Sequence, residues 1–193
     1  MKLDTNLLQW AREIENYTLT EDRIEIIPQN HINLYQRMTN HLFNDNVPVL
    51  QVYTDDKYFA FVVRIEFQCK RRYDQCGIVV YMDSKNWLKA SIGYENEEFH
   101  RLGSDVTNNG YLDWTSTNVD ASIESMWFRL NRRENDFCIE NSIDGVRYKK
   151  MHICHMFNVA KVIPLGLYAC SVEGVSFKVV FSDIEISDCK WID

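Results

Sequence analysis

The sequence predicts an all-β fold built from antiparallel strands. Alternating apolar and polar residues recur along most of the chain, and clusters of turn residues interrupt them about every 8 to 12 residues. No amphipathic run of helical length follows residue 47. About a dozen short strands in this arrangement are typical of an antiparallel sandwich or barrel.

The composition indicates one globular domain over residues 1–193. Apolar residues make up 46% of the chain and charged residues 25%, and the 13% of aromatic residues favours β structure. A chain of this length buries roughly 70% of its unfolded surface when it folds. We therefore expect it to fold without a disulfide, a metal or a cofactor.

The net charge of −7 disfavours nucleic acid as a partner, because a phosphate backbone would be repelled. The one tight basic cluster, Lys70-Arg71-Arg72, is expected on a loop that follows a long strand. No apolar run is long enough to cross a bilayer, and the first residues lack a leader pattern, so no membrane partner is expected. The six cysteines form no C-x-x-C pair, and we interpret them as reduced thiols in a cytoplasmic protein.

The first fifty residues carry the weakest signals. Residues 10–14 and 24–27 resemble short strands, and residues 49–53 form a further strand. Residues 31–46 are polar and predict a loop, in which residues 35–42 could form one or two helical turns.

Residues 58–68 form the clearest strand, because large apolar side chains occupy every second position. The same parity, followed along the chain, predicts the residues that are buried between the sheets. They are Phe59, Phe61, Ile65, Leu88, Ile92, Phe128, Leu130, Leu167 and Phe181.

A hairpin over residues 73–95 organises the rest of the prediction. In its second strand Leu88 and Ile92 share an apolar face, whereas Trp87 and Lys89 share the opposite, mixed face. The turns are expected at residues 83–86, 95–98, 108–110, 134–136 and 144–145. The later strands are expected at residues 99–107, 127–133, 137–143, 164–171 and 176–186, and residues 111–125 fit no single element.

The final strand changes its apolar phase near Ser182-Asp183, from Phe177, Val179 and Phe181 to Ile184 and Ile186. A change of parity within one strand predicts a β-bulge or a bend at that point.

Several short motifs occur in an order that resembles one known family. They are Tyr73-Asp74-Gln75-Cys76-Gly77, Asn86-Trp87-Leu88-Lys89, Trp127-Phe128-Arg129-Leu130, Ser142-Ile143-Asp144-Gly145, Gly166-Leu167-Tyr168-Ala169-Cys170-Ser171 and Phe181-Ser182-Asp183-Ile184. Over residues 45–187 the chain resembles a concanavalin A-like family of unknown function, the regulation-of-enolase-like family. It departs from that pattern at Cys76 and Ser91, where the family pattern has Ala and Gly.

The resemblance implies a concanavalin A-like jelly-roll sandwich of two antiparallel sheets, the fold of lectins and glucanases. Similar domains also occur attached to glycosidases. In such a fold the outer face of one curved, concave sheet can hold a saccharide.

Parity places a mixed aromatic and charged set on the face opposite the apolar one, and this set is the candidate ligand site. Its members are Tyr81, Trp87, Lys89, Glu95, Arg129, Glu140 and Tyr168, with Asp74 and Gln75 in the preceding loop. We expect Trp87 to offer an exposed ring for stacking, with Arg129 and Glu95 as a polar clamp. Asp74 and Gln75 could bind a ligand or secure their own loop through an Asx-turn, and the second role is favoured.

Other chemistries have weaker support. Glycoside hydrolysis needs two carboxylates that flank the bond, and Glu95 with Glu140 is the one pair that parity suggests besides Asp183-Ile184-Glu185. His152, Cys154 and His155 carry zinc-ligand types without an evident fourth ligand. We therefore predict no catalytic residues and no metal site.

The leading function is a non-catalytic binding module for carbohydrate or a related polar metabolite. The first alternative is a cytosolic protein-interaction or regulatory subunit of carbohydrate metabolism. The second alternative is a glycosidase-like enzyme.

Overall fold

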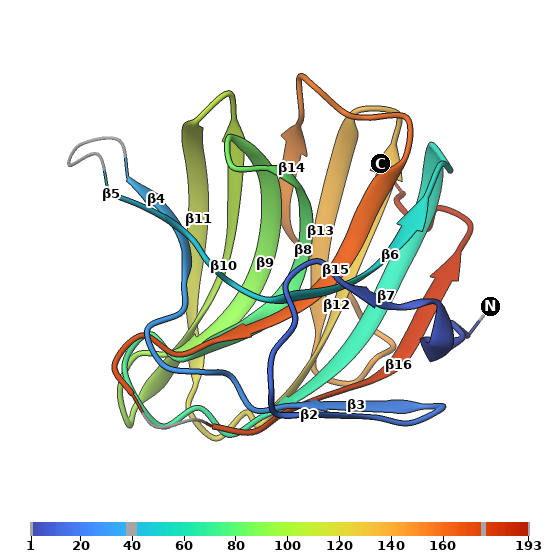
Figure 1. Ribbon diagram of the computed structural model, residues 1–193. Helices are drawn as coiled ribbons and strands as arrows, with labels where there is room; N and C mark the ends of the chain where they lie inside the picture. Colours follow the sequence, from blue (N-terminus) through green and yellow to red (C-terminus); the bar gives the residue numbers. More distant parts are fainter. Residues whose placement is uncertain (1, 38–41, 175–176, 193) are drawn as a thin grey trace.

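Two seven-stranded antiparallel sheets face each other in the computed structural model, which describes residues 2–37, 42–174 and 177–192 (Figure 1). Sheet A has the spatial order β14 (Lys149–His155), β13 (Asp136–Ser142), β12 (Ser125–Arg133), β7 (Tyr58–Phe67), β16 (Val179–Ser187), β3 (Arg23–Ile26), β2 (Tyr17–Leu19). Sheet B has the order β1 (Gln9–Trp10), β6 (Val49–Thr54), β15 (Ile163–Cys170), β8 (Gln75–Asp83), β9 (Asn86–Tyr94), β10 (Phe99–Asn108), β11 (Tyr111–Asp120). The predicted all-β fold of two antiparallel sheets is confirmed.

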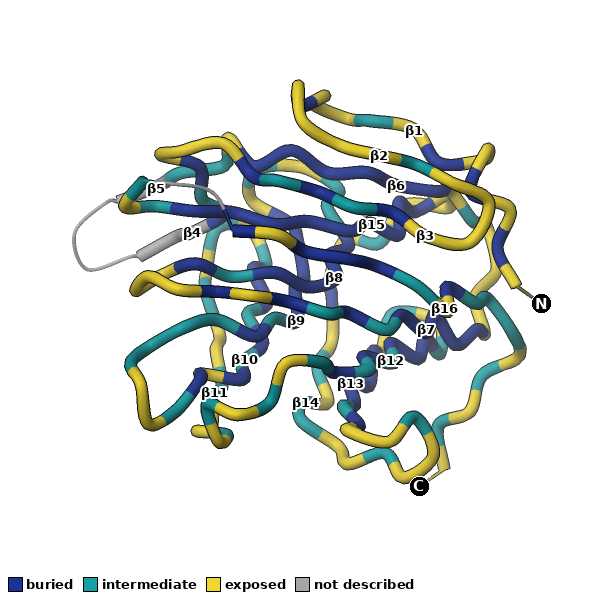
Figure 2. The backbone as a smooth tube through the Cα atoms, turned by 90° about the horizontal axis from the view of Figure 1, so that it is seen from below, coloured by how far each residue is buried: buried dark blue, intermediate teal, exposed yellow. Residues whose placement is uncertain are grey.

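The hydrophobic core lies between the two sheets, where Figure 2 shows the buried segments of both gathered together. All nine side chains that parity placed in the core belong to it, and none is more than 3% exposed. Burial of a large apolar side chain contributes about 1.5–3 kcal/mol before the entropy cost is subtracted. The strict alternation in β7 and β9 therefore fixes which face of each sheet is inward.

Four of the five predicted turns connect neighbouring strands directly, whereas Asp144-Gly145 lies within the six-residue connection 143–148 between β13 and β14. Asn109 and Gly110, which join β10 to β11, have φ values of 52° and 86°, as a two-residue hairpin turn requires. The register of β16 against β7 shifts between Ser182 and Glu185, and Asp183 has a φ of 49°. The β-bulge predicted from the change of apolar phase is confirmed.

Several stretches differ from the prediction. The strand expected at residues 10–14 is wrong beyond Trp10, where β1 ends, and β2 and β14 were not expected. Within the predicted loop 31–46, β4 (Leu34–Arg37) pairs with β5 (Leu42–Asp45), while residues 38–41 of the possible helical turns lie outside the described residues. Residues 111–125, which fit no single element, supply β11, the edge strand of sheet B. An edge strand carries polar side chains on both faces, so alternation does not reveal it.

The only helical element in the described chain is the 3-10 turn η1 (Thr5–Leu7), capped by the Asp4 side chain. The described residues contain no helix with the length and hydropathy that a membrane span requires.

Candidate binding groove

The outer face of sheet B is divided into a covered half and an open half. Residues 30–37 and 42–48, which include β4 and β5, cross the outer face of the sheet before the chain enters β6 (Figure 1). Hydrogen bonds attach both parts to the sheet: Ile32 N donates to the Ser171 carbonyl at 3.1 Å, and Tyr81 donates to Asp45 Oδ2 at 2.8 Å. We call residues 30–37 and 42–48 the covering segment.

Between the covering segment and sheet B lies a second apolar cluster, to which both contribute side chains and which is separate from the core between the sheets. It comprises Ile32, Leu34, Val47, Val49, Val79, Trp87, Tyr168 and Cys170. Trp87 and Tyr168 are both 0% exposed. Burial raises the pKa of Tyr168 well above its usual value, and burial with a hydrogen bond to Asp45 raises the pKa of Tyr81 to about 12.

The prediction of Trp87 as an exposed stacking platform is therefore wrong in its geometry. Parity placed Trp87 correctly on the outer face of β9, opposite Leu88 and Ile92. The covering segment then buries its ring, so Trp87 has no face to offer a ligand. Tyr168 is removed from solvent in the same way.

The open half contains a groove of about 540 Å³. Its lining is Asn33, Arg72, Tyr73, Asp74, Gln75, Lys89, Ser91, Gly93, Tyr94, Glu95, Arg101, Gly103, Asp105, Trp114, Thr115, Ser116 and Val172. Four of the nine predicted site residues are among them: Asp74, Gln75, Lys89 and Glu95.

A row of small residues makes the groove hollow. Gly77, Ser91, Gly103 and Ser116 lie directly opposite one another across β8, β9, β10 and β11. A Cβ on Gly77 would overlap the carbonyl oxygen of Ala90, and a Cβ on Gly103 would lie 3.2 Å from the carbonyl oxygen of Thr115. The close packing that requires glycine here also leaves the floor without large side chains.

One wall of the groove is an ion pair at the border with the covered half. Lys89, which is only 3% exposed, has its Nζ 3.0 Å from Asp105 Oδ2. The same ammonium group donates to the Leu34 carbonyl at 2.7 Å and to Gln75 Oε1 at 3.3 Å. These three partners hold the buried charge, so Lys89 joins the covering segment to the groove wall.

The opposite end of the groove carries a carboxylate held between two arginines. Glu95 accepts hydrogen bonds from Arg72 at 2.8 and 3.1 Å through Oε1 and from Arg101 at 3.2 Å through Oε2. The Glu95 side chain is 17% exposed, whereas those of Arg72 and Arg101 are 56% and 45% exposed. Glu95 is thus an anchor that orients two accessible guanidinium groups.

Tyr73 in the groove lining is 46% exposed, and the more exposed aromatic residue there is Trp114 on β11, which the sequence reasoning missed. It is 61% exposed and lies directly opposite Asp105, in the row that continues to Lys89. The Asn109-Gly110 turn contains the signal that would have found it. A two-residue turn pairs residue 108 with 111 and therefore 105 with 114.

Asp74 has a structural role. It is 0% exposed and accepts a hydrogen bond from the Ser171 hydroxyl at 2.7 Å and from the backbone amides of Lys70 and Arg71 at 3.2 and 3.0 Å. This carboxylate fixes the loop that carries Arg72, and the favoured reading of Asp74 as a loop anchor agrees with its contacts. Gln75 Oε1 accepts hydrogen bonds from Lys89 Nζ and from the Tyr168 hydroxyl, and these bonds fix the Gln75 side chain in the groove wall.

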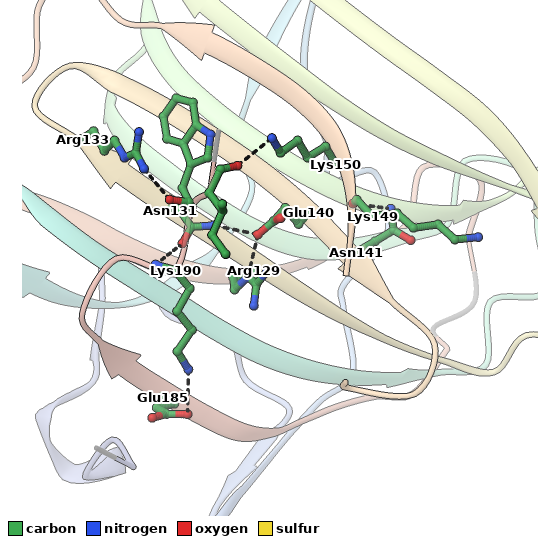
Figure 3. A network of polar contacts seen from close by, with 11 residues as sticks. Arg129, Asn131, Arg133, Glu140, Asn141, Lys149, Lys150, Glu185 and Lys190 are labelled. Carbon is green, nitrogen blue, oxygen red and sulfur yellow. Dashed lines mark hydrogen bonds and ion pairs between the residues drawn. The ribbon is translucent and has the colours of Figure 1, made fainter. Parts of the chain in front are cut away.

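Arg129 and Glu140 lie on the outer face of sheet A and not with the other predicted site residues. Arg129 Nε donates to Glu140 Oε2 at 2.5 Å, and Asn131 donates to the same oxygen at 2.8 Å (Figure 3). The C-terminal residues 188–192 lie over this network, where the Lys190 amide donates to Asn131 at 2.9 Å and Lys150 donates to the Ile192 carbonyl at 2.8 Å. Arg129 also lies over the Tyr148 ring at 3.9 Å.

The predicted clamp of Arg129 with Glu95, and the paired carboxylates Glu95 and Glu140, are therefore wrong. The two members of each pair are on the outer faces of different sheets. Both faces point away from the core, and alternation along a strand separates outward from inward residues without telling which sheet the strand belongs to.

The His152–His155 stretch forms β14 at the edge of sheet A. His152 Nδ1 lies 2.8 Å from the Ser104 hydroxyl of β10, and His155 Nδ1 lies 2.6 Å from Asp136. Ser104 is 1% exposed, so this contact joins the edge strand of sheet A to β10 of sheet B and does not present a nucleophile to solvent. Within the described ranges, no three His, Cys, Asp or Glu side chains come together as a metal site would require.

All six cysteines are free thiols. Burial raises the pKa of Cys138 to about 11 and those of Cys154 and Cys170 to about 12. A thiol with so high a pKa is a poor nucleophile at neutral pH.

Two comparisons with known sequences identify relatives. Residues 10–189 match the family described as "Protein of unknown function (DUF1349)". Over 125 residues the chain is 30% identical to Regulation of enolase protein 1 of Saccharomyces cerevisiae. That match covers 65% of this chain and 62% of the relative, so the chain spans less than two thirds of the relative's length.

Solved structures confirm the concanavalin A-like sandwich. A functionally unknown protein from Saccharomyces cerevisiae superposes with a TM-score of 0.88 at 22% identity, covering 96% of this chain and 98% of that one. The GH43 BlXynB protein from Bacillus licheniformis gives 0.71 at 14% identity, over 96% of this chain and 37% of that one. A legume lectin-like domain from Entamoeba histolytica gives 0.63 at 11% identity, over 95% and 90%.

At these identities the structures define the fold, while the sequence match over residues 10–189 defines the family. The chain belongs to the DUF1349 family of proteins of unknown function.

Proposed function

We propose that this protein is a non-catalytic binding module that recognises carbohydrate, or a related polar metabolite, in the groove of sheet B. The observation that carries the proposal is the position of Trp114. Its ring is 61% exposed at the rim of a floor made of Ser91, Gly103 and Ser116.

This arrangement matches the two surfaces of a sugar ring. The apolar C–H face of a sugar stacks on an aromatic ring, and the Trp114 ring is already exposed to solvent in the unbound protein. The hydroxyl groups need donors and acceptors nearby, which Ser91, Ser116 and the charged side chains at the two walls supply.

The polar walls are held in place before a ligand arrives. Lys89 is fixed by three partners and Glu95 by two arginines. Side chains that are already ordered lose little conformational entropy on binding, so their hydrogen bonds contribute more of their energy to affinity.

The fold comparisons support a saccharide as the ligand class. One similar structure is named a legume lectin-like domain, and another belongs to a GH43 protein, of which this chain matches 37%. The groove favours binding over hydrolysis, because both accessible carboxylates, Glu95 and Asp105, are already engaged by basic side chains. Hydrolysis would need one carboxyl group to donate a proton and a second to attack or activate water.

The test is a titration of wild-type protein with a panel of neutral and acidic oligosaccharides, followed by tryptophan fluorescence and calorimetry. Stacking should shift the emission of an exposed indole to the blue, and Trp114→Ala should remove most of the affinity. Tyr111→Ala is the matched control, since Tyr111 is 66% exposed on the same strand but does not line the groove. Silence of the folded wild-type protein across the panel, or equal loss in both variants, would contradict the proposal.

A second candidate function is a regulatory protein contact. It is favoured by the 30% identity to a yeast protein named for regulation of enolase. Sedimentation of the purified chain with purified enolase tests it directly. A complex that forms with wild type and persists in Trp114→Ala would favour this alternative over saccharide recognition.

A further inference from the structure

The basic cluster Lys70-Arg71-Arg72 is close to the groove, although the protein as a whole carries a net charge of −7. Arg72 lines the groove at the end farthest from Trp114, and Arg101 approaches the same point from β10. At this end two partly exposed guanidinium groups contact one carboxylate, Glu95, while the second carboxylate of the lining, Asp74, is fully buried and bonded to Ser171 and to backbone amides.

We infer that this end of the groove is an anion subsite, and that the favoured ligand is a saccharide or sugar derivative carrying a carboxylate or a phosphate. The inference rests on the proposed saccharide function and adds the chemical class of the ligand. The anionic group would lie between Arg72 and Arg101.

Hydrogen-bond donors remain for such a group. Each guanidinium has five N–H donors, and Glu95 occupies only the Nε and one terminal nitrogen of Arg72, and only the Nε of Arg101. Among the described residues, the remaining terminal nitrogens of these two arginines donate to no further partner, and both side chains are about half exposed. Glu95 therefore orients the two planes and leaves outward donors for a ligand.

The loop that carries Arg72 is itself fixed. The buried carboxylate of Asp74 holds the amides of Lys70 and Arg71, and Arg71 donates to the Glu173 carbonyl at 3.2 Å. Arg72 lies over the Tyr73 ring at 5.0 Å. A loop anchored by a fully buried carboxylate is a stable support for a charged binding group.

The spacing suits one ligand that reaches both ends. Trp114 is opposite Asp105, and Arg101 is four residues from Asp105 along β10, a separation of about 13 Å. A saccharide of more than one ring, stacked on Trp114, would bring an acidic group to Arg101 and Arg72. The neutral Lys89–Asp105 pair at the other end provides no comparable net charge.

The experiment compares three matched ligands by calorimetry at low salt: a neutral hexose oligosaccharide, its terminal hexuronate form and its terminal hexose 6-phosphate form. Inorganic phosphate alone is the fourth probe. We expect the acidic forms to bind about tenfold more tightly than the neutral form, and added salt to reduce only this difference. Comparison of the hexuronate with the phosphate identifies which acidic group is preferred.

The double variant Arg72→Gln with Arg101→Gln should bring the ratio of acidic to neutral affinity down to about one, and this ratio is the readout because both side chains also line the groove. Arg64→Gln is the matched control, because Arg64 is paired with Glu66 in sheet A and does not line the groove. Both variants change exposed or partly exposed ion pairs and should keep the wild-type unfolding midpoint.

The outcomes separate the two proposals. Equal affinity for neutral and acidic forms would overturn the anion subsite and leave saccharide binding intact. Binding of none of the saccharides would overturn both. Inorganic phosphate binding as tightly as the sugar phosphate, and lost in the double variant, would support the anion subsite and contradict saccharide recognition.

Discussion

Trp87 and Trp114 lie on the outer face of the same sheet, two strands apart, and have opposite environments. Trp87 is 0% exposed beneath the covering segment, whereas Trp114 is 61% exposed beside the groove. Along β9 the change occurs within a few residues, from Trp87 through the buried Lys89 to the open Ser91. The difference shows that the face of a strand does not decide whether a side chain can bind a ligand; a distant segment of the chain decides it.

The covered half therefore has the character of a second core, and the open half that of a binding surface. In the first, apolar contacts with Leu34, Val47 and Val49 stabilise the fold. In the second, small residues and fixed charges leave space for a ligand. Substitutions in the two halves should affect different measurements.

The largest expected effect is on the stability of the covered half. Trp87→Ala should lower the free energy of unfolding by about 3–5 kcal/mol, because it leaves a cavity beneath the covering segment. Trp114→Ala should change it by about 1 kcal/mol or less, since the ring is mainly exposed. Chemical denaturation of both variants measures the contrast, and similar losses in the two would break it.

The open half should respond in affinity. Ser116→Tyr places a large ring over the groove floor and should weaken saccharide binding by about tenfold or more, with little change in the unfolding midpoint. Thr117→Tyr on the same edge strand is the control, because Thr117 is exposed and does not line the groove. Binding that is undiminished in Ser116→Tyr would show that the ligand does not occupy this groove.

The smallest expected effect is a pH dependence in the covering segment. Burial, followed by the hydrogen bond to Asp45, raises the pKa of Tyr81 from 10.0 to about 12 in the folded protein. A raised folded pKa means that the stabilisation is fully present below pH 10 and is lost as the pH rises through about 12. The difference in unfolding free energy between wild type and Tyr81→Phe should thus shrink from pH 9 towards pH 12, and a difference independent of pH would refute this role for Tyr81.

The core and the turns were predictable because their signals are local. Alternation in β7 and β9 identified the inward side chains, and the phase change at Ser182-Asp183 identified the bulge. Fold class followed from the same periodicity and was strengthened by the motif order.

The candidate site was only partly predictable, for two physical reasons. Parity distinguishes the inward face of a strand from its outward face, but it does not distinguish outward residues of one sheet from those of the other. Arg129 and Glu95 were therefore assigned to one site incorrectly. Parity also does not show whether another part of the chain packs on an outward face. The polar composition of residues 31–46 therefore did not predict that Trp87 would be buried. Trp114 was missed because its strand is at an edge and lacks an apolar face.

The most direct test of the central claim follows the indole N–H signals of the five tryptophans in ¹⁵N-labelled protein during titration with a saccharide that binds. The proposed groove predicts that the Trp114 signal and the backbone amides of Ser91 and Ser116 shift with ligand, while the Trp87 signal stays in place. Shifts confined to Trp191 and the residues beneath it on sheet A, with Trp114 unchanged, would contradict the assignment of the open half of sheet B as the binding surface.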